Sequence, residues 1–134
     1  HDISIEPRAF RPDGPRLWFG GQKLHGALLR RLVSYGHGWH PLGAPSEDDV
    51  LALTAAMTAA GRDAAELEWI GGTRAVFPDD ESCADLGQAM AAIPPQLEGG
   101  FTTFGLKPSQ YIDDPAELES FCADVIRRAD AMAT

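Results

Sequence analysis

Two kinds of segment alternate along this chain. Short apolar runs predict strands, and longer stretches with apolar residues three to four positions apart predict helices. We expect the strands at 16–21, 38–42, 67–77 and 101–106. We expect the helices at 23–35, from Ser46 to Gly61, at 82–92 and from Asp114 onward. This regular alternation is typical of parallel strands that are joined by helical crossovers.

Four strand–helix units are compatible with two α/β architectures. One is a small open sheet, and the other is the C-terminal half of a (β/α)8 TIM-type barrel, which typically needs ~250 residues. We expect residues 16–134 to form such a (βα)4 half-barrel, part of a single larger barrel domain, and residues 1–15 to form a Pro-rich arm or loop. An isolated half-barrel would expose strand edges that something has to cover.

Composition narrows the classes of function. The 134 residues are 44% hydrophobic and 23% charged, which is typical of a soluble globular domain. The net charge of -9 argues against nucleic-acid binding, which needs a basic face. Cys83 and Cys122 lack metal-ligand spacing, so we expect no metal site and two reduced, semi-buried thiols in a cytoplasmic protein. No apolar run approaches the ~20 residues of a membrane span.

The first predicted strand ends in Gly20 and Gly21, and Gln22 and Lys23 then lead into a helix. A Gly-Gly turn at a helix N-terminus brings backbone N–H groups close together, which suits an anionic group such as a phosphate. Lys23 would add a cation to this cradle. The same four residues are also compatible with a tight strand-to-helix turn that carries a solvated lysine.

Trp39 and His40 end the second predicted strand. In a barrel the C-terminal ends of the strands hold the active site, where this pair would supply an aromatic wall and a polar contact. The alternative is a core tryptophan beside a hydrogen-bonded histidine. The sequence shows no nucleophile–base pair and no P-loop, and the catalytic residues are unknown. Redox chemistry that is carried by a bound cofactor would need neither.

Two cations follow the third and fourth predicted strands. Arg74 comes after the interruption at Gly71–Gly72, where it would clamp an anion or lie as a surface arginine beside a bulge. Lys107 would contact an anion or lie in a solvated loop. If the strands belong to one barrel, Lys23, Arg74 and Lys107 would meet at its mouth.

Several blocks of this sequence resemble the second half of the luciferase-like monooxygenase superfamily. The most specific are Arg16–Gly21 and Gly38–Pro41, and further ones are Ala27–Arg31 and Ala60–Asp63. Within that superfamily, Phe101–Tyr111 and the helix at Asp114-Pro115 resemble the flavin- or coenzyme F420-dependent oxidoreductases. The resemblance covers essentially the whole chain. It departs at His37, where the family often has Asp before Gly-Trp.

The resemblance implies a (β/α)8 barrel that transfers a hydride between coenzyme F420, or alternatively FMN, and a small organic substrate. It places Gly20, Gly21, Gln22 and Lys23 at the cofactor phosphate, with Trp39 and His40 facing the pocket. Arg74 and Lys107 are assigned to the cofactor by position alone. The family's first four βα units are missing, so we expect the N-terminal half of the same barrel as a partner, and a homodimer of the complete protein. The alternative is a non-catalytic half-barrel binding module that dimerises.

Overall fold

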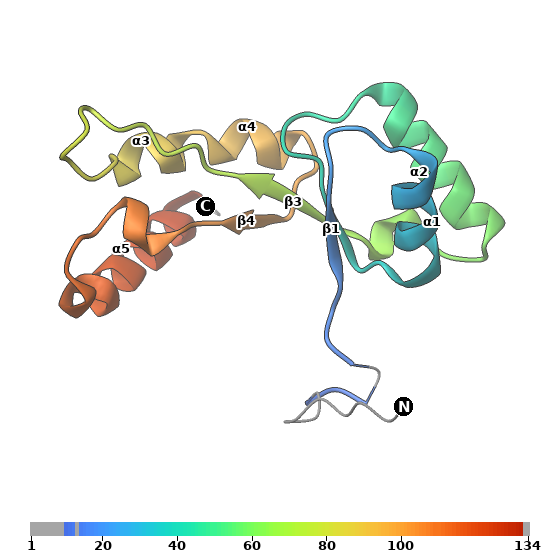
Figure 1. The fold of residues 1–134 in the computed structure, drawn as a ribbon, viewed down its shortest axis with the longest axis horizontal. Helices are drawn as coiled ribbons and strands as arrows, with labels where there is room; N and C mark the ends of the chain where they lie inside the picture. The colour runs from blue at the N-terminus through green and yellow to red at the C-terminus, as the bar shows by residue number, and fades with distance from the viewer. Residues whose placement is uncertain (1–9, 13, 133–134) are drawn as a thin grey trace. The chain divides into compact units, whose positions relative to one another are not determined.

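The computed structural model describes residues 10–12 and 14–132, which form two compact units. The first unit extends to Glu68 and the second begins at Trp69. Both contain helices and parallel strands (Figure 1), which confirms the α/β class. Most of the expected Pro-rich arm lies outside the described residues.

The first unit is a strand–helix–strand module followed by a second helix (Figure 1). Its elements are β1 (Trp18–Gly20), α1 (Gly26–Tyr35), β2 (Gly38–His40), α2 (Glu47–Ala59) and the 3-10 turn η1 (Ala64–Glu66). β1 and β2 pair in parallel, with Trp18 opposite Gly38 and Gly20 opposite His40. The carboxyl ends of both strands therefore lie at one edge of this module.

Both helices of the first unit form in the predicted segments, but α1 begins at Gly26 rather than at residue 23. The Ser46 side chain accepts a hydrogen bond from the Asp49 N–H and thereby caps α2. Gly61 follows the end of α2 with φ at +74°, a conformation that favours glycine. The apolar faces of α1 and α2 supply a core made of Leu28, Leu32, Leu53 and Met57, joined by Trp39 of β2.

One arginine closes the C-terminal end of α1. Arg62 Nη1 donates to the carbonyl oxygens of Leu32 and Val33, both at 3.0 Å, and Nη2 donates to the Gly36 oxygen at 2.9 Å. The last carbonyls of a helix have no partner within the helix, and a guanidinium fork can satisfy several of them at once. Arg62 therefore fixes the turn between α1 and β2 from a segment thirty positions away.

The second unit repeats the strand–helix order with shorter elements. They are β3 (Glu68–Gly72, which begins at the last residue of the first unit), α3 (Leu86–Ala91), α4 (Ile93–Glu98), β4 (Thr103–Gly105), η2 (Pro108–Gln110), η3 (Pro115–Glu117) and α5 (Leu118–Met132). β3 and β4 pair in parallel, with Ile70 opposite Thr103 and Gly72 opposite Gly105. A core cluster lies among Ala84, Ala89, Tyr111 and Phe121.

The predicted end of the third strand is wrong, and a helix that the sequence did not predict follows α3. The third strand ends at Gly72 rather than Phe77, because its partner β4 ends at Gly105 and Pro108 then starts a 3-10 turn. Helix α3 begins at Leu86 rather than at residue 82 and ends at Ala91, before Pro94-Pro95 as predicted, but α4 then contains both prolines in its first turn. Proline is tolerated there because first-turn N–H groups have no partner within the helix.

The apolar side chains of the last helix, α5, are only partly buried. Phe121 is buried, whereas Ile126 is 61% exposed and Leu118 is also exposed. Cys122 is exposed as well, so its expected semi-buried position is wrong, while Cys83 is half-buried as expected. Both thiols are free.

Gly71 marks a close approach rather than a bulge. A Cβ atom at this position would lie 2.5 Å from Phe104 Cε1 and 2.7 Å from Gln96 Oε1. We expect Gly71→Ala to lower the free energy of unfolding by about 1–3 kcal/mol, because overpacking forces neighbours to shift. Gly105→Ala is the control, since no atom lies within 4 Å of its Cβ position. Urea unfolding of both variants measures the difference, and equal midpoints would contradict the packing.

Removal of the Arg62 side chain tests the clamp on α1. We expect Arg62→Ala to lower the free energy of unfolding by about 2–3 kcal/mol, because three partly buried hydrogen bonds from a charged donor to carbonyl oxygens are lost. Arg62→Lys should retain only part of the lost stability, because an ammonium lacks the planar fork of a guanidinium. Arg31→Ala, an exposed position on α1, should stay within about 0.5 kcal/mol in the same urea titration. A loss at Arg62 no larger than at Arg31 would rule out the clamp.

Candidate phosphate-binding loop

The loop Gly20–Lys23 lies at the carboxyl end of β1, beside the end of β2. The Gly21 N–H donates to the His40 carbonyl oxygen at 3.0 Å, and Trp39 Nε1–H donates to the Gly21 carbonyl oxygen at 3.2 Å. Both backbone polar groups of Gly21 are thus fastened to the end of β2. These two hydrogen bonds fix the direction in which the chain continues from Gly21 into Gln22 and Lys23.

Trp39 supports the loop from inside the first unit. Its side chain is 0% exposed, so in this unit it does not form the aromatic wall expected of a pocket. The physical reason is that a flat, apolar indole is most stable inside the core when its single N–H finds an acceptor, here Gly21. Trp39 is therefore a positioning residue, and the core alternative of the sequence analysis describes it better.

The free N–H groups of the loop are fewer than the Gly-Gly pattern suggests. The Gly21 N–H is occupied by His40, and the Leu24 N–H faces Asp49 Oδ2 at 3.4 Å. Within the part of the chain that the structure describes, the N–H groups of Gln22 and Lys23 have no hydrogen-bond partner, and both residues are exposed. An anion would meet these two amides and the Lys23 ammonium.

Asp49 and His25 complete the surroundings of the loop. The Asp49 carboxylate places a negative charge next to Leu24, and this charge opposes an anion. His25 caps α1 with its Nδ1, which accepts from the Leu28 N–H at 3.4 Å. No pattern in the sequence indicates either contact. The Leu24–Asp49 contact spans 25 positions and leaves no local signal.

Arg74 and Lys107 occupy equivalent positions in the second unit. Gly72 pairs with Gly105, so each cation follows its paired glycine by two residues. Thr73 Oγ1 donates to the Gly105 carbonyl oxygen at 3.2 Å, so the contact between the two segments continues past the ends of β3 and β4. Both cations are exposed at the same edge of this unit. Lys23 belongs to the first unit, and the meeting of all three cations stays a prediction.

Neither a metal centre nor a membrane span is found among residues 10–12 and 14–132. No group of His, Cys, Asp or Glu in this part of the chain could hold a metal ion. No helix there is long and apolar enough to cross a membrane. Comparisons of the chain with models of protein families, with curated proteins and with solved structures found no match.

The anchor of the loop can be tested at Trp39. We expect Trp39→Phe to lower the free energy of unfolding by about 1–3 kcal/mol, because it removes a buried donor and leaves the Gly21 carbonyl unsatisfied. Amide exchange at Gly21 should also become faster, because the loop loses one of its two ties. Trp18→Phe is the matched control, since Trp18 is 52% exposed on β1. Equal effects of both substitutions would contradict the positioning role of Trp39.

Proposed function

We propose that this chain is the C-terminal half of a (β/α)8-barrel oxidoreductase similar to the luciferase-like monooxygenases. Its substrates would be a deazaflavin, coenzyme F420, or alternatively FMN, together with a small organic molecule. The observation that carries the proposal is the loop at the carboxyl end of β1, where Gly21 is tied to β2. The amides of the next two residues, Gln22 and Lys23, have no hydrogen-bond partner among the described residues. Parallel strands in both units support the barrel half without distinguishing it from a small open sheet.

The chain's own residues would bind and orient the cofactor. The Gln22 and Lys23 N–H groups would donate to phosphate oxygens, and the Lys23 ammonium would neutralise part of the phosphate charge. The cofactor ring would supply the hydride chemistry. Arg74 and Lys107 would form a second anion contact, which favours F420 because its anionic tail is longer than that of FMN. His40, half-buried at the end of β2, would contact the pocket.

The exposed side of β1 supports a partner for this chain. β1 is an edge strand, and two apolar residues at its start, Leu17 and Trp18, are exposed. An open strand edge with apolar side chains favours pairing with another strand. We assign this edge to the N-terminal half of the same barrel, in a cytoplasmic protein whose complete form is a homodimer.

The same edge favours a second candidate, a non-catalytic half-barrel binding module that dimerises. In that case two copies of this chain would cover each other's exposed strand edges. Native mass spectrometry separates the two candidates. A symmetric dimer of this chain without affinity for FMN or F420 would favour the binding module, whereas cofactor binding would favour the oxidoreductase.

Two substitutions with opposite expected effects test the anion site. We expect Lys23→Ala to weaken FMN and F420 binding roughly fivefold, which is the value of an exposed charge contact of about 1 kcal/mol. Asp49→Asn should tighten the binding of both cofactors, because it removes a repelling charge and keeps an acceptor for the Leu24 N–H. Fluorescence titrations at low salt measure both dissociation constants.

Arg31→Ala is the control for this pair, since Arg31 is an exposed cation on α1 outside the loop. Its dissociation constants should equal those of the unsubstituted chain. The phosphate site is contradicted if neither Lys23→Ala nor Asp49→Asn changes the affinity, or if all three substitutions change it equally.

A further inference from the structure

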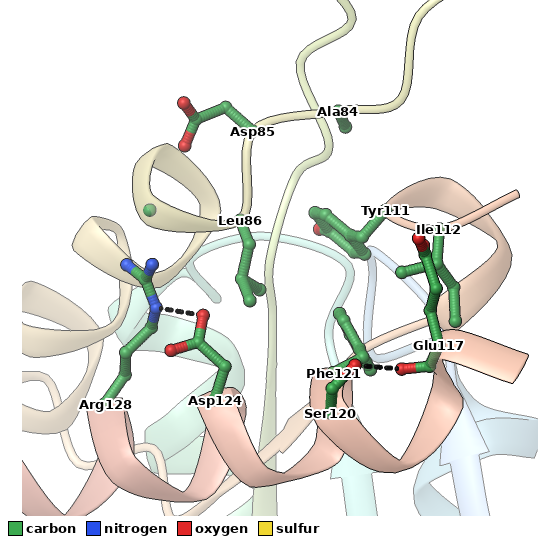
Figure 2. A pocket seen from close by; sticks show the side chains of 11 residues that line it. Ala84, Asp85, Leu86, Tyr111, Ile112, Glu117, Ser120, Phe121, Asp124 and Arg128 are labelled. Atoms are coloured by element: carbon green, nitrogen blue, oxygen red, sulfur yellow. Dashed lines mark hydrogen bonds and ion pairs between the residues drawn. The ribbon is translucent and has the colours of Figure 1, made fainter. Parts of the chain in front are cut away.

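The second unit contains a cavity of about 470 Å³ that the proposed function does not use. It lies between the start of α3, the segment around Tyr111 and the first turns of α5 (Figure 2). Its walls combine apolar side chains, above all Leu86 and Phe121, with the polar groups of Asp85, Tyr111, Glu117 and Arg128. A mixed cavity of this size suits a small organic molecule.

Tyr111 lines this cavity and carries an unsatisfied, buried polar atom. Its side chain is 8% exposed, and its ring stacks on Phe121 with the ring centroids 5.8 Å apart. Figure 2 shows the ring directed into the pocket between Leu86 and Phe121. Among the described residues, its hydroxyl is the one buried side-chain polar atom without a hydrogen-bond partner. Leaving such a group unpaired costs about 1–3 kcal/mol, which a ligand that hydrogen-bonds to it would recover.

The polar groups of the cavity are mostly acceptors. Asp124 is already neutralised, because Arg128 Nε donates to its Oδ2 at 2.8 Å and Arg127 contacts its other oxygen. The same contacts hold the pKa of Asp124 below its usual value. Asp85 and Glu117 have no cationic partner among the described residues. Asp85 caps α3, because its Oδ1 accepts from the Gln88 N–H at 2.8 Å. Glu117 is therefore the carboxylate of this cavity that forms neither an ion pair nor a helix cap among the described residues.

Acidic groups close to the half-buried Cys83 raise the pKa of its thiol. Burial raises the pKa of its thiol first, the hydrogen bond to Asp113 and the charge of Asp113 raise it further, and the charge of Glu117 adds to the effect. Cys83 can report on the charge at Glu117.

We propose that this cavity binds a small organic ammonium ion with an apolar body. The ammonium would donate hydrogen bonds to the Glu117 carboxylate and to the Tyr111 hydroxyl oxygen, which satisfies both groups at once. The apolar body would pack against Leu86 and Phe121, and the aromatic rings of Tyr111 and Phe121 would attract the cation. This site is independent of the proposed oxidoreductase, because all of its residues lie in the second unit and none belongs to the predicted cofactor set.

Charge recognition is tested with two probes of the same shape. We expect 2-phenylethylammonium to bind the full chain at one saturable site in a calorimetric titration, at least tenfold more tightly than 2-phenylethanol. Glu117→Gln should weaken the binding of the ammonium roughly tenfold, because one charged hydrogen bond is lost. Glu119→Gln is the matched control, since Glu119 is exposed on α5 and does not line the cavity.

Tyr111→Phe tests the hydroxyl separately from the fold. Without a ligand, this substitution should leave the unfolding midpoint unchanged or higher, because it removes a buried group that has no partner. It should nevertheless weaken the binding of 2-phenylethylammonium several-fold. Tyr35→Phe is the control and should leave this affinity unchanged, because Tyr35 is exposed in the first unit. In a Cys122→Ser background, the bound ammonium should lower the pKa of Cys83, measured by the pH dependence of its alkylation rate.

Three results would overturn this inference. The first is the absence of saturable binding at millimolar 2-phenylethylammonium. The second is equal affinity for the ammonium and the alcohol, which would make the cavity merely apolar. The third is an ammonium affinity that neither Glu117→Gln nor Tyr111→Phe changes. None of these results bears on FMN or F420 binding by the loop after β1.

Discussion

The two hydrogen bonds on Gly21 are the constraint on which the account of this chain depends. The His40 carbonyl accepts from the Gly21 N–H, and the buried indole of Trp39 donates to its carbonyl. The ends of β1 and β2 are thereby tied to the core of the first unit through a side chain with no exposed surface. Only with this anchor do the amides of Gln22 and Lys23 have a defined position from which to meet an anion.

Charge separates the two candidate binding regions of the molecule. The chain carries a net charge of -9, so any anion site has to gather its few cations locally. Lys23 in the loop and the aligned pair Arg74 and Lys107 in the second unit meet that need. The cavity beside α5 has the opposite character, because the acidic residues Asp85 and Glu117 line it. The two proposals therefore place an anionic cofactor and an organic cation at different parts of the chain.

The sequence predicts the α/β class and the positions of the main helices. Helix α2 begins directly after Ser46, where the sequence predicts it, because its cap involves neighbouring residues only. Contacts between distant segments are not predictable in this way. Arg62 reaches the end of α1, and Asp49 reaches Leu24, through packing that no local pattern records. The burial of Trp39 is equally hard to predict, because it depends on which helices cover β2. The expected barrel, cofactor and activity stay predictions.

The most direct test of the central claim is an NMR titration of the chain with FMN, followed at individual backbone amides. We expect large shifts at Gln22 and Lys23 and a smaller one at Gly21, because the Gly21 N–H is already bonded to His40. Weaker shifts should appear near Arg74 and Lys107 if the anionic end of the cofactor reaches the second unit. Saturable binding that leaves Gln22 and Lys23 unshifted, or no binding at all, would contradict the loop as the phosphate site.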